Sequence, residues 1–183
     1  MFRSLLLICG LMLSALVISA PAQDIFNPLP NKPVQQRGDT RFETVEYSFD
    51  LPNATWRATS KKEVANAELV YGDRLDGFLQ IRKIDAANMT FEDVIDREQN
   101  QKLLVLPGIV NGKMEKNFKG NFNGSVANYE FIQSGKQMLG RAYFLKADDK
   151  TVYVLRFTAL RDKLNLIRNQ TDSIARTFKL KSK

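Results

Sequence analysis

The first 22 residues limit the chemistry of this chain more than any other segment does. Arg3 is followed by an apolar run over residues 5–18 and then by small residues that end at Ala22. This order is typical of a secretory signal peptide, and we expect cleavage after Ala22. The only cysteine, Cys9, lies inside this leader, and the sequence contains no histidine. The exported chain is therefore expected to have no disulfide, no thiol nucleophile and no imidazole base.

The leader also predicts where the protein acts. Its apolar run is short for a bilayer span, so we expect a secreted or periplasmic protein without stable membrane insertion. The chain carries a formal net charge of +7 at pH 7. Outside the cytoplasm, this charge favours weak attraction to an anionic envelope polymer or an envelope protein, and not to nucleic acid. A basic surface that only keeps the protein soluble explains the same composition.

Composition divides the remaining chain into two parts. Residues 23–41 form a polar stretch rich in proline and asparagine, which we interpret as a linker. Residues 42–183 are expected to form a single α+β domain, and this length can bury a stable core without disulfides. The many phenylalanine and tyrosine residues and the one tryptophan supply that core.

Period-two alternation predicts strands in the first half of the domain. Over residues 45–51, apolar side chains alternate with polar ones, as in a half-buried strand that Pro52 ends. A short strand at residues 56–60 and a hairpin of residues 68–71 with residues 78–84 are expected to follow. Thr90 then resembles a helix N-cap, with Asp93 three residues later, and the helix is expected to run to about residue 106.

From residue 113 onward, the sequence predicts a meander of strands. Turn signals occur at Asn123-Gly124, Ser134-Gly135 and Asp148-Asp149. Residues 151–159 carry apolar side chains on both faces, so this strand is expected to be central, with helices on both sides of the sheet. A final helix is indicated by an apolar stripe with steps of three or four residues: Leu160, Leu164, Ile167, Thr171, Ile174 and Phe178. The predicted α+β fold is a largely antiparallel sheet of about six to eight strands with helices packed on its faces.

This pattern resembles the PsbP-like family of secreted or lumenal α/β/α sandwich domains. The resemblance is carried by residues at the start, in the meander and at the end of the domain: Tyr47, Phe49, Pro52 and Trp56, Gly140-Arg141-Ala142-Tyr143, Val152-Tyr153-Val154-Leu155, and residues 174–178. These are core and turn positions, so the resemblance implies a fold and not an activity. Members of the family are mostly accessory or assembly subunits, and the resemblance assigns no catalytic, cofactor-binding or metal-binding residue.

Two features of the sequence suggest residues that could bind a partner. Trp56 is interpreted first as an aromatic residue that closes the end of the sheet, and alternatively as an anchor for a partner. Basic residues on one stripe of the final helix and in the tail form a possible partner surface: Arg161, Arg168, Arg176, Lys179 and Lys181. The acidic pairs Asp73 with Asp76 and Asp148 with Asp149 are interpreted as turn formers and not as metal ligands.

The sequence leaves three functional hypotheses open. The first is a non-catalytic accessory module that binds a protein or another envelope component. The second is a carrier of a small apolar ligand, with a pocket between the sheet and the helix at residues 90–106. The third and most remote is a hydrolase with a metal held by oxygen ligands. We expect a protein that is not an enzyme and has no cofactor.

Overall fold

The computed structural model describes residues 40–59, 64, 66–73 and 76–181. The predicted signal peptide, its cleavage site and nearly all of the predicted linker lie outside these residues. Within these described residues, the chain forms two sheets and two helical segments. The first sheet holds β1 (Arg41–Glu43), β2 (Tyr47–Asp50) and β10 (Lys179–Leu180). The second holds β3 (Trp56–Ala58), β4 (Leu69–Tyr71), β5 (Gly77–Asp85), β6 (Val110–Phe118), β7 (Gly124–Gln133), β8 (Lys136–Lys146) and β9 (Thr151–Leu160).

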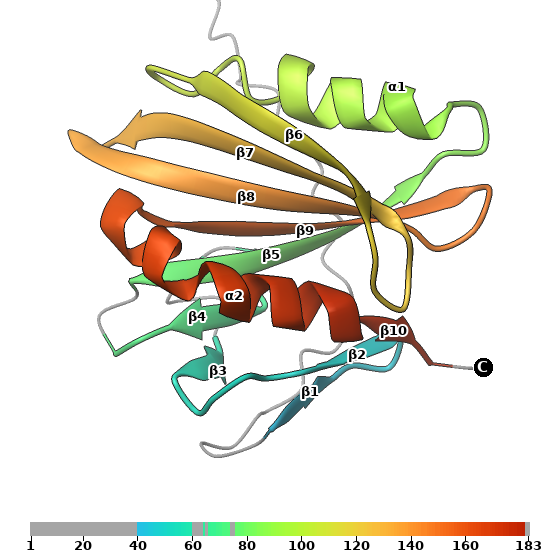
Figure 1. Ribbon diagram of the computed structural model, residues 1–183, viewed down its shortest axis with the longest axis horizontal. Coiled ribbons are helices and arrows are strands. Elements are labelled where there is room, and N and C mark those ends of the chain that lie inside the picture. The colour runs from blue at the N-terminus through green and yellow to red at the C-terminus, as the bar shows by residue number, and fades with distance from the viewer. Residues whose placement is uncertain (1–39, 60–63, 65, 74–75, 182–183) are drawn as a thin grey trace, which may run out of the picture.

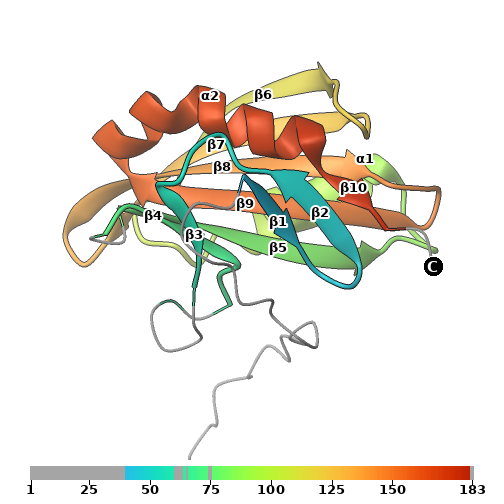
Figure 2. The ribbon, with the colours of Figure 1, turned by 90° about the horizontal axis from the view of Figure 1, so that it is seen from below.

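The layers follow the predicted α/β/α order. The seven strands of the large sheet lie in the order β3-β4-β5-β9-β8-β7-β6, and every neighbouring pair is antiparallel. The helix α1 (Phe91–Asp96) lies on one face, and α2 (Arg161–Thr177) lies on the other beside the small sheet (Figure 1, Figure 2). The α+β fold with a C-terminal meander is therefore confirmed. No helix within the described residues is long and apolar enough to cross a membrane.

Strand β9 occupies the centre of the large sheet, as its two apolar faces predict. It pairs with β5 on one side and with β8 on the other. Leu155 and Phe157 are buried in the core beneath α2, whereas Val152 and Val154 are buried in the core beneath α1. The apolar stripe of α2 is buried as expected at Leu164, Ile167, Thr171 and Ile174. Two separate cores, one on each face, therefore stabilise the sandwich.

The first predicted strand differs from the structure. We expected one strand over residues 45–51, but β2 begins only at Tyr47, and Val45 is exposed in a turn. The Thr44 hydroxyl accepts hydrogen bonds from the backbone N–H groups of Glu46 and Tyr47, which ends the extended backbone there. Strand β1 precedes this turn and begins at Arg41, inside the predicted linker. Tyr47 and Phe49 pack on Phe178, with ring centroids 5.2 and 6.3 Å apart, so β2 joins β10 and not the large sheet.

The predicted helix at residues 91–106 is shorter than expected. Its N-terminus is confirmed, because Thr90 and Asp93 form a reciprocal capping box. The α-helix ends at Asp96 and continues as a π-helical turn, η1 (Arg97–Gln101), which the bond from Lys102 N to the Arg97 carbonyl closes at 3.1 Å. The adjacent side chains of Glu98 and Gln99 are both buried. The regular helix therefore ends well before Pro107, next to these buried polar groups.

Of the predicted turns, one is displaced. Ser134 and Gly135 have φ angles of 50° and 73°, which fits a two-residue hairpin turn with positive φ at both positions. The chain does not turn at Asn123-Gly124, because β7 already begins at Gly124. A Cβ atom at Gly124 would lie 1.9 Å from the Phe144 carbonyl oxygen. Gly124 therefore permits close strand packing, and the reversal occurs just before it.

Candidate functional site

A groove lies between α1 and the ends of β6, β7 and β8. We call it the α1–β6 groove, and its volume is about 550 Å³. Apolar side chains contribute to its lining from both sides, with Phe91 and Ile95 from α1 and Met114 from β6. These side chains are only partly buried, because they pack against the edge of the core beneath α1. The groove lies between the sheet and the helix, where the carrier hypothesis expects a pocket.

The two sides of the groove carry opposite charges. Helix α1 contributes Glu92 and Asp96, whereas the strands and the loop after β6 contribute Lys116, Lys119 and Lys146. Asp149 lies 2.9 Å from Lys146, and its hydrogen bond and charge raise the pKa of that ammonium group. The groove can therefore receive a ligand that is apolar in the middle and charged at its margins.

The sequence shows Lys116 and Lys119 on either side of Phe118, but it did not place them with Lys146 beside one groove. Two register shifts interrupt the pairing of β6 with β7, one between Asn111 and Met114 and one between Glu115 and Phe118. Each β-bulge changes which residues face the same side, so simple alternation no longer sorts the side chains of β6. The positive φ of Asn117, 65°, belongs to the second irregular stretch.

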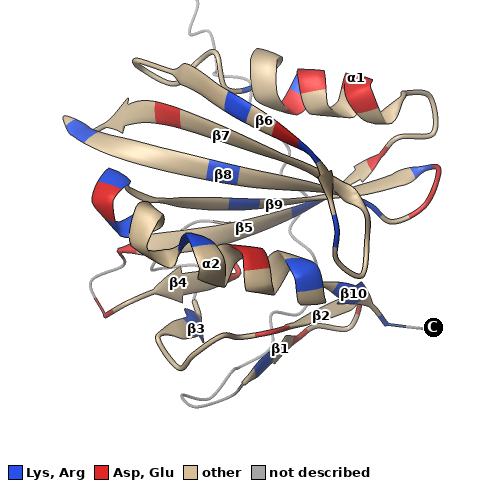
Figure 3. Ribbon diagram, viewed as in Figure 1, with Lys and Arg blue, Asp and Glu red and all other residues tan. Residues whose placement is uncertain are grey.

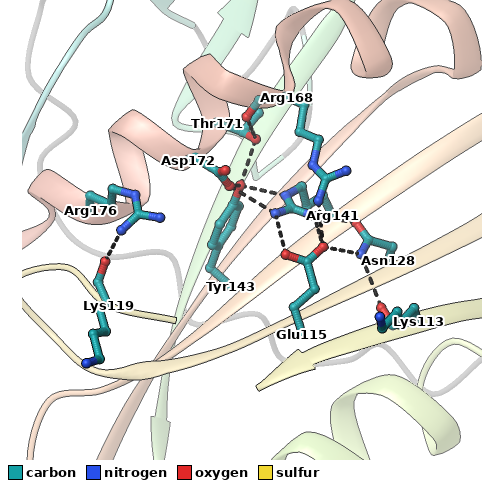
Figure 4. A network of polar contacts seen from close by, with 10 residues as sticks. All are labelled: Lys113, Glu115, Lys119, Asn128, Arg141, Tyr143, Arg168, Thr171, Asp172 and Arg176. Carbon is teal, nitrogen blue, oxygen red and sulfur yellow. Dashed lines mark hydrogen bonds and ion pairs between the residues drawn. The ribbon is translucent and has the colours of Figure 1, made fainter. Parts of the chain in front are cut away.

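On the opposite face, a polar network joins β6, β7 and β8 to α2 (Figure 4). Its centre is Arg141, whose side chain is 3% exposed. Arg141 donates to Glu115 Oε1 at 2.9 Å, to Asp172 Oδ1 at 3.0 Å and to the Tyr143 hydroxyl at 2.7 Å. The Tyr143 hydroxyl also donates to Asp172. The two carboxylates share one buried guanidinium, which satisfies the charge of Arg141 inside the sandwich.

The charges of this network shift two pKa values in opposite directions. The hydrogen bond from Arg141 holds the pKa of the Glu115 carboxyl below its usual value. Burial raises the pKa of the Tyr143 hydroxyl, which stays a neutral donor. The contacts of Arg141 join neighbouring strands to one another through Glu115 and join the sheet to α2 through Asp172. The network is therefore structural.

The residues of the predicted partner surface are exposed but contact neighbouring parts of the domain. Their partners are Glu130 for Arg161 at 3.5 Å, Glu115 for Arg168 at 2.8 Å, Glu43 for Lys181 at 2.8 Å and the Lys119 carbonyl for Arg176. Lys179 is exposed on β10. Basic and acidic segments alternate along α2 (Figure 3), so acidic neighbours reduce the positive potential that the sequence alone predicts.

Trp56 occupies the position that its first interpretation predicts. The side chain is 2% exposed, and its ring lies 5.0 Å from Tyr71 and 5.7 Å from Phe157. The indole N–H donates to the Gln170 side-chain carbonyl at 2.9 Å. The anchor interpretation requires an accessible indole, and the structure corrects it, because packing between the sheet and α2 covers the ring.

The acidic pairs also behave as part of turns. The Asp148 carboxylate accepts a hydrogen bond from Lys150 N at 2.8 Å, and Asp76 pairs with Lys163 at 3.8 Å. Across the residues that the structure describes, no three potential metal ligands lie close together.

Comparison with known proteins identifies the fold. No protein-family model matches the chain, and no curated protein matches its sequence. The cyanobacterial PsbP of Synechocystis, CyanoP, is a structural match with a TM-score of 0.53 and 13% identity, covering 81% of this chain and 95% of CyanoP. LpqN of Mycobacterium tuberculosis, which is involved in cell envelope biogenesis, matches with a TM-score of 0.52 and 15% identity over 80% of this chain and 87% of LpqN.

A third match is the Pseudomonas aeruginosa protein PA94, whose function is unknown. Its TM-score is 0.51 and its identity 14%, over 81% of this chain and 88% of PA94. At these identities the matches establish the fold alone. The predicted PsbP-like fold is therefore confirmed.

Proposed function

We propose that this chain is an exported, non-catalytic accessory module that binds an envelope protein through the α1–β6 groove. The observation that carries this proposal is the groove itself, with apolar lining residues and opposite charges on its two sides. Such a surface suits an amphipathic segment of a partner protein, whose charged residues can pair along both margins. The predicted leader and the fold shared with CyanoP and LpqN support an envelope setting.

The shape of β6 favours contact through side chains. β6 lies at the edge of the large sheet, where an extended peptide could add a further strand. Its two bulges interrupt the regular spacing of backbone donors and acceptors that such pairing requires. We therefore place the partner segment in the groove and not along the backbone of β6.

A carrier function is the second candidate, because the groove volume also fits a small ligand. Pockets of roughly 300–1,000 Å³ hold drug-sized molecules, and about 550 Å³ lies within this range. The charged margins argue for an amphiphile, with an apolar body against Met114 and a polar head among the lysines. Both candidates use the same residues, so one experiment separates them.

Met114→Lys is expected to abolish binding in the groove, because it puts a charge into the apolar lining. The measurement is native mass spectrometry of the protein purified from its own host. We expect wild type to retain a partner protein, and Met114→Lys to retain about tenfold less or none. The matched control is Leu166→Lys, which adds the same charge at an exposed position on α2. Thermal midpoints verify that both variants are folded.

The outcomes distinguish the two candidates. A small molecule that wild type retains and Met114→Lys loses would support the carrier and reject the accessory module. Retention of the same partner by the folded Met114→Lys variant would remove the groove from both candidates.

We also propose that the basic residues near α2 strengthen contact with an anionic envelope polymer. The residues are Arg161, Arg168, Arg176, Lys179 and Lys181, and all are exposed. Changing Arg161, Arg168 and Arg176 together to glutamine is expected to reduce retention on isolated envelopes at 0.1 M salt. At 1 M salt the difference should vanish, since the screening length falls from about 10 Å to about 3 Å. Equal retention of the folded triple variant and wild type at low salt would reject this surface.

A further inference from the structure

A buried ionic cluster lies beneath η1, on the face of the sheet that α1 covers. Glu98 is the one carboxylate that the described residues contribute to its centre, and the Glu98 side chain is 0% exposed. Glu98 Oε2 accepts a hydrogen bond from Arg82 Nη1 at 2.9 Å, and Lys102 Nζ lies 2.9 Å from Oε1. Arg156 Nη2 and Arg97 Nε lie farther away, 3.8 and 3.9 Å from the carboxylate oxygens. Four cations therefore surround one carboxylate.

The charges of this cluster do not balance. Arg97, Lys102 and Arg156 have no ion pair with a second carboxylate among the described residues. Even with Arg82 left aside, a single carboxylate cannot neutralise these three cations, and like charges in a partly buried site repel one another strongly. The cluster is thus short of negative charge.

The hydrogen bonds of the cluster are also incomplete. Arg156 Nε, Arg156 Nη2 and Arg97 Nε are shielded from solvent and have no hydrogen-bond partner among the residues that the structure describes. Lys102 is close to Glu98 Oε1, but this oxygen accepts no hydrogen bond of good geometry. Buried polar groups nearly always have partners, and an unfilled charged donor is especially costly. The planar fork of an arginine side chain matches the oxygens of a phosphate or carboxylate.

The margin of the cluster is open to solvent, although the unpaired nitrogens themselves are covered. The Arg156 side chain is 16% exposed, and the side chains of Arg97 and Lys102 are each about one-third exposed. Lys102 and Arg97 approach Glu98 Oε1, whereas Arg156 approaches Oε2, the oxygen that Arg82 binds. None of the cluster residues lines the α1–β6 groove, so the two sites are separate. The irregular turn η1 brings Glu98 into this position, and π-helical turns are frequent at functional sites.

We propose that this cluster is an oxyanion-binding site, in which a phosphate or carboxylate group binds beside Glu98 and accepts hydrogen bonds from Arg156 and Arg97. Lys102 adds positive charge at the margin. Glu98 acts as a positioning residue, which holds the cations together when the site is empty. This site is independent of the proposed groove and of its partner.

The test is a titration of the ¹⁵N-labelled mature protein with sodium phosphate or sodium acetate, at constant ionic strength maintained with sodium chloride. We expect saturable shifts of the Nε–H signals of Arg156 and Arg97 with at least one of these anions. If only phosphate gives saturable shifts, the site binds a phosphate group. If acetate gives saturable shifts, the site binds a carboxylate group. The absence of saturable shifts with either anion would overturn the proposal, whatever the variants show.

Three variants separate binding from a structural role. Arg156→Gln is expected to weaken binding by about tenfold or more, because it removes a charge-assisted pair. Glu98→Gln should tighten binding, since it removes the only negative charge of the cluster. Arg161→Gln, which neutralises an arginine on the opposite face, should bind as wild type does. Weaker binding by a folded Glu98→Gln variant would also contradict the proposed site.

Discussion

Phe157→Ala is expected to lower the free energy of unfolding by about 3–5 kcal/mol. Phe157 lies on the central strand β9 and is fully buried beneath α2. Its ring packs edge-on against Trp56 and Tyr143, with centroids 5.7 and 5.6 Å apart. Truncation leaves a cavity that these large rings cannot fill, because each is held by its own hydrogen bond. Urea denaturation of the variant and of wild type measures the difference.

The matched control is Leu166→Ala, which also truncates an apolar side chain. Leu166 is exposed on α2, so its change should stay within about 0.5 kcal/mol. Equal stabilities of the Phe157 and Leu166 variants would contradict the central position of β9. If the free energy of unfolding of Phe157→Ala depended on urea concentration with a different slope, the denatured state would instead be altered.

Local sequence patterns predicted most elements of the large sheet and its helices. The two apolar faces of β9, the apolar stripe of α2 and the cap at Thr90 each depend on residues close together in the sequence. Local preferences therefore agree with the final fold at these positions. The pairing of β2 with β10 was not predictable in this way, because nearly the whole domain lies between these two strands.

The buried charged residues needed information about distant neighbours. Arg141, Tyr143 and Leu145 are two residues apart along β8, so their side chains lie on the same face of the sheet, and all three are buried. A charged residue on such an apolar face is a usable signal for a buried ion pair. Its partners could not be named from the sequence, since Glu115 lies on a bulged strand and Asp172 on a helix. Helical spacing placed Glu98 on one face with Val94 and Ile95, which is a comparable signal, but its cationic partners on β5 and β9 could not be named from the sequence.

Arg141→Met is expected to lower the free energy of unfolding by about 3 kcal/mol at pH 7. The substitution keeps much of the side-chain volume but leaves Glu115 and Asp172 without their shared cation. The matched control is Arg168→Met, which removes a second arginine from the same carboxylate, Glu115 Oε1, at 2.8 Å. The Arg168 side chain is 55% exposed, so this change should cost less than about 1 kcal/mol. Similar losses in both variants would show that burial does not decide the strength of these pairs.

The pH dependence of Arg141→Met tests the same network independently. In wild type, Arg141 lowers the pKa of Glu115 in the folded state, so folding releases a proton near the ordinary carboxyl pKa. The resulting stabilisation is fully present above about pH 4.5 and is lost as the pH falls through the lower folded-state pKa. Without Arg141 the largest part of this contribution is lost, and Asn128 and Arg168 keep only a smaller part of it. The difference in the free energy of unfolding between the variant and wild type should therefore narrow below about pH 4. Urea denaturation of wild type and Arg141→Met from pH 7 to pH 3 measures this difference in the free energy of unfolding. A difference that stays constant over this range would mean that packing of the Arg141 side chain, and not its charge, stabilises the contact between the sheet and α2.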